Sequence, residues 1–129
     1  MKNLVSKLRF PFLLLAVVAL LSFQASKPEE MSIDVAPSIL NLANAGKWVT
    51  VHTDIPYSVL VSATITLNGV EIKWSKADNQ GNFVAKFVIG DIKNLPLKLN
   101  EYNTLTMTCV TNNVVYVGSQ DVKVISARK

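Results

Sequence analysis

The sequence predicts an all-β fold, an antiparallel β-sandwich of about seven to nine strands. Two observations favour this class. Short runs of β-branched and aromatic residues recur after residue 31, and turn signals rich in Gly, Pro, Asn and Asp separate them. No apolar stripe with helical spacing follows residue 26. The size, about 100 residues, is that of an immunoglobulin-like domain, and a small β-barrel is the main competing architecture.

The expected strands follow one another at short intervals. They cover residues 33–35, 38–42, 48–53, 64–67, 70–74, 83–89, 105–111, 114–117 and 121–125. The clearest hairpin has Asn68-Gly69 at its turn, because a type I′ turn needs positive φ at both central residues. Asn112-Asn113 predicts a second two-residue turn, and residues 75–82 are expected to form a polar loop.

Side chains alternate between the two faces of a strand, so the pattern also predicts which residues share a face. The expected sets are Val49 with Val51; Trp48 with Thr50 and His52; Phe83 with Ala85 and Phe87; and Leu105 with Met107 and Cys109. Cys109 is the only cysteine, which excludes an intramolecular disulfide. We expect a buried thiol, and the alternative is a bond to a second chain.

Residues 1–26 have the pattern of a secretory signal. Three basic residues precede an uncharged apolar run at 10–23, and Gln24, Ala25 and Ser26 follow it. A helix of that run would span roughly 21 Å, whereas a bilayer core is roughly 30 Å thick. We therefore expect an exported protein that is secreted, periplasmic or displayed at the cell surface. The alternative is a retained N-terminal hydrophobic helix that anchors the chain in the membrane through residues 8–25.

The remainder divides into a linker at 27–31, the sandwich at 32–126 and a polar tail at 127–129. The net charge of +4 is misleading, because three basic residues lie in the N-terminal segment. Ten basic residues against nine acidic ones remain after residue 26. The exported part is nearly neutral and has no basic run, so nucleic acid is not an expected partner.

Several stretches carry a family resemblance through their order and spacing. They are Ile33-Asp34-Val35-Ala36-Pro37-Ser38 with residues 40–42, Gly46-Lys47-Trp48-Val49-Thr50-Val51, Ile65-Thr66-Leu67-Asn68-Gly69, Ala85-Lys86-Phe87, and Leu105-Thr106-Met107-Thr108 with residues 117–125. Together they resemble exported bacterial immunoglobulin-like modules of surface and secreted proteins, some of which lie beside dockerin-type segments. The resemblance implies a non-catalytic sandwich with a structural, adhesive or protein-interaction role at the cell envelope or outside the cell.

The same family often has an acidic loop before the strand that carries Lys-Phe. In this chain the corresponding loop, residues 77–82, contains one carboxylate, Asp78. Calcium prefers about six to eight oxygen ligands, usually with several carboxylates. We expect an ordinary Asn/Gly-rich turn and no cofactor. The alternative is a weak calcium-binding surface loop formed by Asp78, Asn79 and Asn82.

Three aromatic residues are candidate ligand contacts: Trp74, Tyr57 and Trp48. Exposed aromatics on a sandwich can stack on sugar rings or contact a protein, so carbohydrate binding is the alternative function. Packing in the core competes with this role, most strongly for Trp48. His52 shares a face with Asp54, but the spacing of nearby hydroxyls favours no nucleophile and one histidine cannot form a multi-His metal site. We therefore expect no enzyme activity, and a protein or glycan of the cell envelope as the partner.

Overall fold

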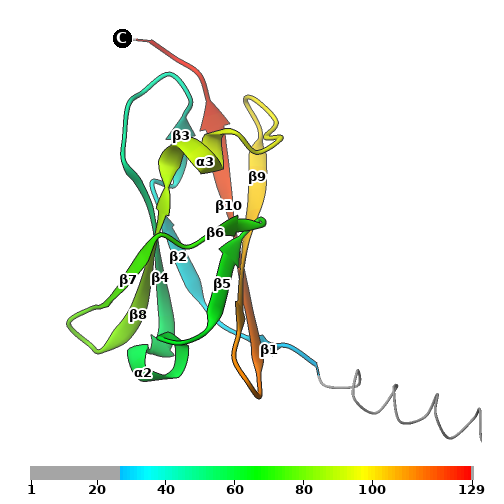
Figure 1. Ribbon diagram of the computed structural model, residues 1–129. Coiled ribbons are helices and arrows are strands. Elements are labelled where there is room, and N and C mark those ends of the chain that lie inside the picture. The colour runs from blue at the N-terminus through cyan, green and yellow to red at the C-terminus, as the bar shows by residue number, and fades with distance from the viewer. Residues whose placement is uncertain (1–26, 129) are drawn as a thin grey trace, which may run out of the picture.

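The computed structural model describes residues 27–128 as two β-sheets packed face to face, which confirms the predicted β-sandwich (Figure 1). The hydrophobic segment predicted at residues 1–26 lies outside the described residues, as does Lys129. Within residues 27–128, no helix is long and apolar enough to cross a membrane.

Ten strands and two short helices make up the described part of the chain. The strands are β1 (Glu29–Glu30), β2 (Ile33–Ala36), β3 (Ile39–Asn41), β4 (Trp48–Pro56), β5 (Thr64–Leu67), β6 (Val70–Glu71), β7 (Trp74–Ala77), β8 (Asn82–Val88), β9 (Tyr102–Val110) and β10 (Val115–Ile125). The helices are α2 (Tyr57–Leu60) and α3 (Ile89–Lys93), which the sequence pattern did not predict.

The strands form a four-stranded and a six-stranded sheet. The four-stranded sheet has the order β2-β4-β8-β7, and all its neighbours are antiparallel. The six-stranded sheet has the order β1-β10-β9-β5-β6, and β3 pairs with β10 along the same edge as β1. Both β1 and β3 run parallel to β10. The N-terminal part of the chain therefore contributes strands to both sheets.

The predicted hairpin is correct at its turn and wrong in its second strand. Asn68 and Gly69 have φ angles of 47° and 85°, as a type I′ turn requires. The strand predicted at 70–74 is split, because the chain leaves the six-stranded sheet after Ile72. The amide of Ile72 donates to the carbonyl of Ile65 at 3.1 Å, and that of Lys73 donates to Lys86 at 2.8 Å. Trp74 therefore begins a strand of the other sheet.

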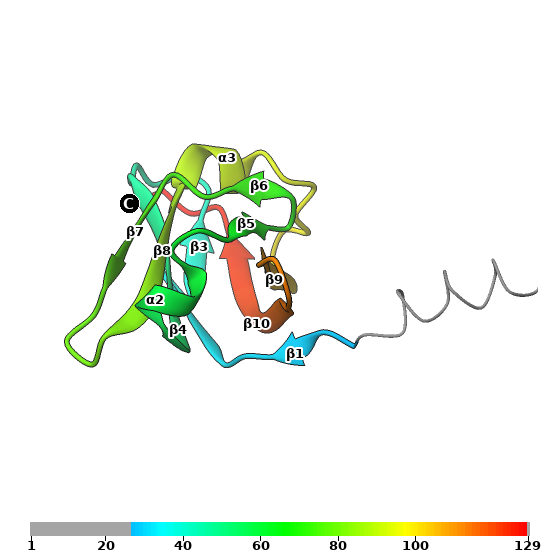
Figure 2. The same ribbon diagram turned by 60° about the horizontal axis from the view of Figure 1, so that its bottom comes forward.

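Two further predictions need correction. Residues 75–77, expected in a polar loop, lie in β7, whose polar side chains occupy an exposed edge strand. The two strands expected at 114–117 and 121–125 are one strand, β10 (Val115–Ile125), with Gly118 inside it. A Cβ at Gly118 would lie 2.7 Å from the carbonyl oxygen of Met31 and 2.7 Å from a methyl carbon of Ile33. The passage from β1 to β2 thus crosses this strand at a point where a side chain does not fit (Figure 2).

The sandwich begins inside the range that the sequence assigned to a linker. Glu29 and Glu30 pair with β10, and the amide of Met31 donates to the carbonyl of Val117 at 3.0 Å. Met31 is only 6% exposed and belongs to the core. These contacts leave Lys27 and Pro28 as the described residues that precede the first strand.

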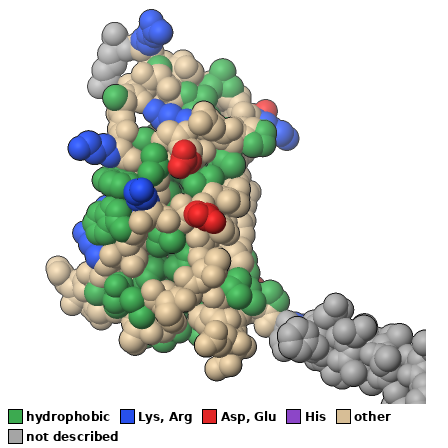
Figure 3. All heavy atoms as spheres, viewed as in Figure 1, with side chains coloured by type: hydrophobic (Ala, Val, Ile, Leu, Met, Phe, Trp, Pro, Cys, Tyr) green, Lys and Arg blue, Asp and Glu red, His purple; other side chains and the backbone are tan. Residues whose placement is uncertain are grey.

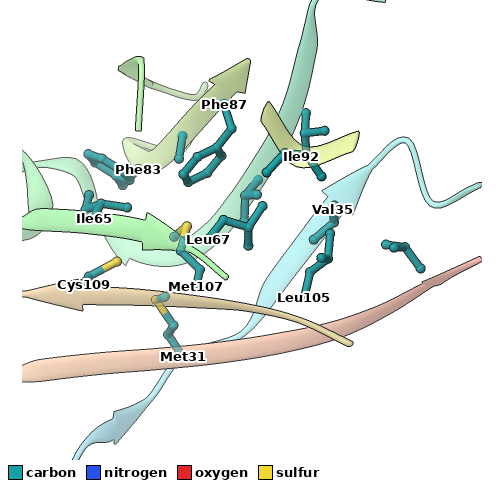
Figure 4. Packing of buried hydrophobic residues seen from close by; sticks show 14 of the residues in the cluster. Met31, Val35, Ile65, Leu67, Phe83, Phe87, Ile92, Leu105, Met107 and Cys109 are labelled. Carbon is teal, nitrogen blue, oxygen red and sulfur yellow. The ribbon is translucent and has the colours of Figure 1, made fainter. Parts of the chain in front are cut away.

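The core lies between the two sheets, and the predicted inward faces are confirmed. The fully buried side chains include Val49, Val51, Phe83, Ala85, Phe87, Leu105, Met107 and Cys109. In Figure 4, the labelled side chains of β5 and β9 meet those of β8 in one apolar layer. Burial raises the pKa of the Cys109 thiol to about 12, because a thiolate would lose its hydration there. Trp48, Thr50 and His52 alternate with the buried residues of β4 and lie on the outer face.

Candidate functional site

The outer face of the four-stranded sheet brings two of the three candidate aromatics together. Trp48 lies opposite Val88, and Trp74 lies opposite Lys86, so both face outward on either side of β8. Their ring centroids are 5.9 Å apart and their planes meet at 89°, an edge-to-face arrangement. We call the surface formed by Trp48, Thr50, Trp74 and Lys86 the aromatic face.

The two tryptophans differ in how much surface they offer. Trp74, on the edge strand β7, is 42% exposed, whereas Trp48 is half-buried on the interior strand β4. Edge-to-face pairs contribute about 0.5–1.5 kcal/mol beyond the burial of area. Trp48 therefore packs against Trp74 and restricts its position, while Trp74 has the surface that could contact a ligand.

A lysine is held beside this pair. The Nζ of Lys86 lies 5.8 Å from the centroid of a Trp74 ring, within the range of a cation–π contact. The same Nζ donates a hydrogen bond of 2.8 Å to the Thr50 hydroxyl on β4. Because that acceptor is neutral, the contact orients the ammonium group without neutralising its charge.

Lysines gather around the aromatic face, and the acidic residues nearest in sequence, Asp54, Glu71, Asp78 and Asp91, flank the segments that form it. Residues 47–53, 72–77 and 82–90 contain four lysines and no acidic residue. The four are Lys47, Lys73, Lys76 and Lys86. Lys76 pairs with Val84 and so shares the outer face with Trp74. Figure 3 shows hydrophobic and basic side chains together at the left edge, over β7. Sequence reasoning found no basic run because the lysines come from three separate segments.

Tyr57 does not belong to the aromatic face. It is the first residue of α2, directly after the end of β4, whereas Trp48 is at the beginning of that strand. Its ring stacks on Phe83 with centroids 5.6 Å apart and planes inclined by 25°. Tyr57 therefore packs at the margin of the core, at the end of the sandwich that α2 closes (Figure 1).

His52 and Asp54 share the outer face of β4, as their alternation predicts, and both are exposed. Asp34 on β2 lies opposite His52 in the antiparallel register. The Asp54 Oδ1 accepts a hydrogen bond of 3.0 Å from the amide of Ser32. This contact gives Asp54 a structural role, because it holds the residue that precedes β2 against β4.

The loop weighed as a calcium site is a tight turn between β7 and β8. The Oδ1 of Asp78 accepts hydrogen bonds of 2.9 Å from the amides of Gln80 and Asn82. The amide of Gly81, at φ +83°, donates to the Asp78 carbonyl at 3.0 Å. Such bonds are typical of an Asx turn. Among residues 27–128, no group of three or more His, Cys, Asp or Glu side chains is arranged to hold a metal ion.

A scan against protein-family models and searches of curated proteins and solved structures found no match to this chain. The resemblance to exported bacterial modules therefore stays a prediction from the sequence. The most specific features among the described residues are the paired tryptophans and the oriented lysine.

Proposed function

We propose that this chain is an exported, non-catalytic binding module with an immunoglobulin-like strand order. In that fold, strands A, B, E and D form one sheet, and G, F and C, extended by C′ in variable-type domains, form the other. Lettering β2 as A, β4 as B and β5 to β10 as C, C′, D, E, F and G reproduces both orders. The separation of β2 and β3 between the sheets is compatible with an A strand shared by the two layers.

The aromatic face is the contact surface in this proposal, and its geometry is the observation that carries it. Trp74 is partly exposed, yet Trp48 and Lys86 limit its freedom. A large side chain that is already ordered loses little conformational entropy on binding, which favours affinity. Tryptophan is also among the residues that contribute most to binding interfaces.

The environments of the thiol, the carboxylates and the histidine considered as candidate reactive groups support a non-catalytic role. The Cys109 thiol is buried and its raised pKa keeps it protonated, which makes it a poor nucleophile. Asp54 and Asp78 accept backbone hydrogen bonds that hold the fold together. His52 is exposed on a strand face beside these structural carboxylates.

The compartment in this proposal follows from the pattern of residues 1–26. Their charged beginning, apolar run and small polar exit support export. The partner would then be a protein or a glycan of the cell envelope. Intact-mass analysis of the native protein in each cell fraction tests this step. A mature chain that begins near Ser26 agrees with a cleaved signal, a full-length chain in the membrane agrees with an anchor, and a full-length chain in the cytosol contradicts export.

Co-sedimentation with isolated envelopes of the producing cells tests the binding surface. Trp74→Ala is expected to lower the bound fraction strongly, whereas Tyr102→Ala, an aromatic on the opposite sheet, should bind like the wild type. Equal binding by the Trp74→Ala protein and the wild type would show that the aromatic face is not the contact surface.

Carbohydrate binding is the second candidate function, and the arrangement of Trp74 favours it over contact with a protein edge. Trp74 and Lys76 project from the same face of β7 rather than along its unpaired edge. A side-chain platform of this kind suits a flat ligand such as a sugar ring.

A further inference from the structure

We propose that the ligand of the aromatic face is an anionic polysaccharide, with a sugar ring on Trp74 and its acidic groups on Lys76 and Lys86. This inference rests on the proposed function, because it names the ligand class of the same surface. Three observations carry it: the exposure of Trp74, the position of Lys76 and Lys86 around it, and the lysine-rich composition of residues 47–53, 72–77 and 82–90.

The exposed indole of Trp74 favours a ring as the stacked group of the ligand. Trp74 is one of the few large apolar side chains with more than a third of its surface exposed in the described domain. The C–H groups on one side of a pyranose ring form a flat apolar surface that matches an indole. Trp48 packs against Trp74 with its ring perpendicular, so the Trp74 indole is held in place before a ligand arrives.

The lysines beside Trp74 favour a negatively charged ligand. Lys76 and Lys86 lie on the same outward face as Trp74, two residues along β7 and directly across on β8. The ammonium of Lys86 is oriented by a neutral hydroxyl and a ring, so its charge is not cancelled by that contact. Lys47 and Lys73 directly precede the two tryptophans in the sequence and add positive charge nearby. A carboxylated or sulfated sugar complements this charge, and a neutral sugar does not.

The small size of the basic patch and the indole within it favour an acidic glycan over other polyanions. After residue 26 the chain has ten basic and nine acidic residues, so the lysines around the aromatic face are not part of a generally basic protein. Nucleic-acid binding depends on neutralising many phosphates along a backbone, which a patch of this size supports poorly. A peptide of Asp and Glu residues alone would satisfy the lysines but would supply no ring for Trp74. An acidic glycan uses both features.

The test is a fluorescence titration of the purified protein with oligogalacturonate, its fully methyl-esterified form and dextran sulfate. The first two probes share the sugar backbone, and the methyl esters of the second remove its negative charge. Oligogalacturonate is expected to bind at low salt and to change the tryptophan emission. Trp74→Ala and Lys86→Gln should each weaken binding by about tenfold, and methyl esterification should weaken it by a similar factor. The matched controls Tyr102→Ala and Lys123→Gln should bind like the wild type.

Lys86→Gln keeps the test informative should Trp74→Ala reduce stability, and thermal unfolding of each variant verifies that it is folded. Failure of both anionic sugars to bind would overturn the inference. Equal affinity for a single-stranded oligonucleotide or polyglutamate would overturn it as well, because charge alone would then explain binding. Loss of envelope binding in Trp74→Ala without any affinity for anionic sugars would leave the proposed function standing. Unchanged envelope binding in that variant would contradict both.

Discussion

Two exposed aromatic residues in this domain each have a lysine over the ring, and they lie on opposite sheets. On the four-stranded sheet, the Lys86 Nζ is 5.8 Å from the Trp74 ring centroid. On the six-stranded sheet, the Lys123 Nζ is 5.2 Å from the Tyr102 ring centroid. Tyr102 is the more exposed of the two aromatics, at 68% against 42%. By exposure and cation–π distance alone, Tyr102 would be the better ligand contact.

Their surroundings reverse that ranking. Trp74 packs against a second tryptophan, and Lys86 is oriented by Thr50. Tyr102 follows Glu101 in the chain, and the next outward residue to Lys123 along β10 is Asp121. Acidic side chains so close reduce the attraction of that region for an anion. A lysine over a ring is therefore a candidate site only where its neighbours order it and leave its charge uncancelled.

Part of the outer face of the six-stranded sheet carries short hydroxyl side chains that bond to their neighbours. The hydroxyls of Thr106 and Ser119 lie 2.7 Å apart, and the Thr104 hydroxyl donates to Asp121 at 2.6 Å. Hydroxyls that already have partners offer less to a ligand, because binding would have to replace those bonds. This face therefore serves as the control surface for the predictions below.

The largest expected effect comes from a substitution that disturbs the six-stranded sheet and leaves the aromatic face alone. Gly118→Ala would place a methyl group 2.7 Å from the carbonyl oxygen of Met31 and should cost about 1–3 kcal/mol of unfolding free energy. Gly90→Ala is the control, because a Cβ there meets nothing within 4 Å. Urea denaturation measures both. Loss of anionic-sugar affinity in folded Gly118→Ala would contradict the independence of the two surfaces.

The second effect concerns Cys109, which lies beneath the control surface. Burial raises its pKa from its ordinary value of 9.0 to about 12, so the folded state retains a proton that the unfolded state loses above pH 9.0. This contribution to stability is complete below pH 9.0 and is lost as the pH rises through about 12, at about 1.4 kcal/mol per pH unit. Cys109→Ala should show a shallower decline in unfolding free energy between pH 9 and 11. Parallel declines in the two proteins would show that the raised pKa of Cys109 does not cause this loss of stability.

The smallest expected changes in unfolding free energy are those caused by replacing Lys86 and Lys123, which can be compared directly. Lys86→Gln should cost about 1 kcal/mol, because the cation–π contact is lost and the hydrogen bond to Thr50 loses its charge. Lys123→Gln loses a cation–π contact at an exposed ring and should cost about 0.5 kcal/mol or less. Urea denaturation at low and high salt gives both values. A larger cost for Lys123→Gln than for Lys86→Gln would contradict this ranking of the two cation–π contacts.

Local patterns predicted the parts of the fold that depend on local chemistry. Alternation identified the inward faces of β4, β8 and β9, and Asn68-Gly69 identified its turn. The change of sheet between Ile72 and Lys73 was missed, because membership of a sheet depends on hydrogen bonds to strands far along the chain. β1 was missed because Glu29-Glu30 has the composition of a linker, and its pairing depends on the space above Gly118.

The candidate site was predicted only in part, because contacts among its residues depend on strands that are far apart in the sequence. Trp48 and Trp74 were identified as single candidates, but their contact depends on β8 lying between β4 and β7. Tyr57 was grouped with them by residue type, although it lies at the other end of β4. The lysines around the aromatic face come from separate segments, so only the folded chain brings their charges together.

The most direct test of the central claim is an NMR titration of the protein with oligogalacturonate that follows backbone amides and indole N–H groups. We expect saturable shifts of the Trp48 and Trp74 indole signals and of the amides in β7 and β8, with the Tyr102 and Lys123 amides unchanged. Shifts confined to β9 and β10, or no saturable shift of either indole, would contradict binding at the aromatic face.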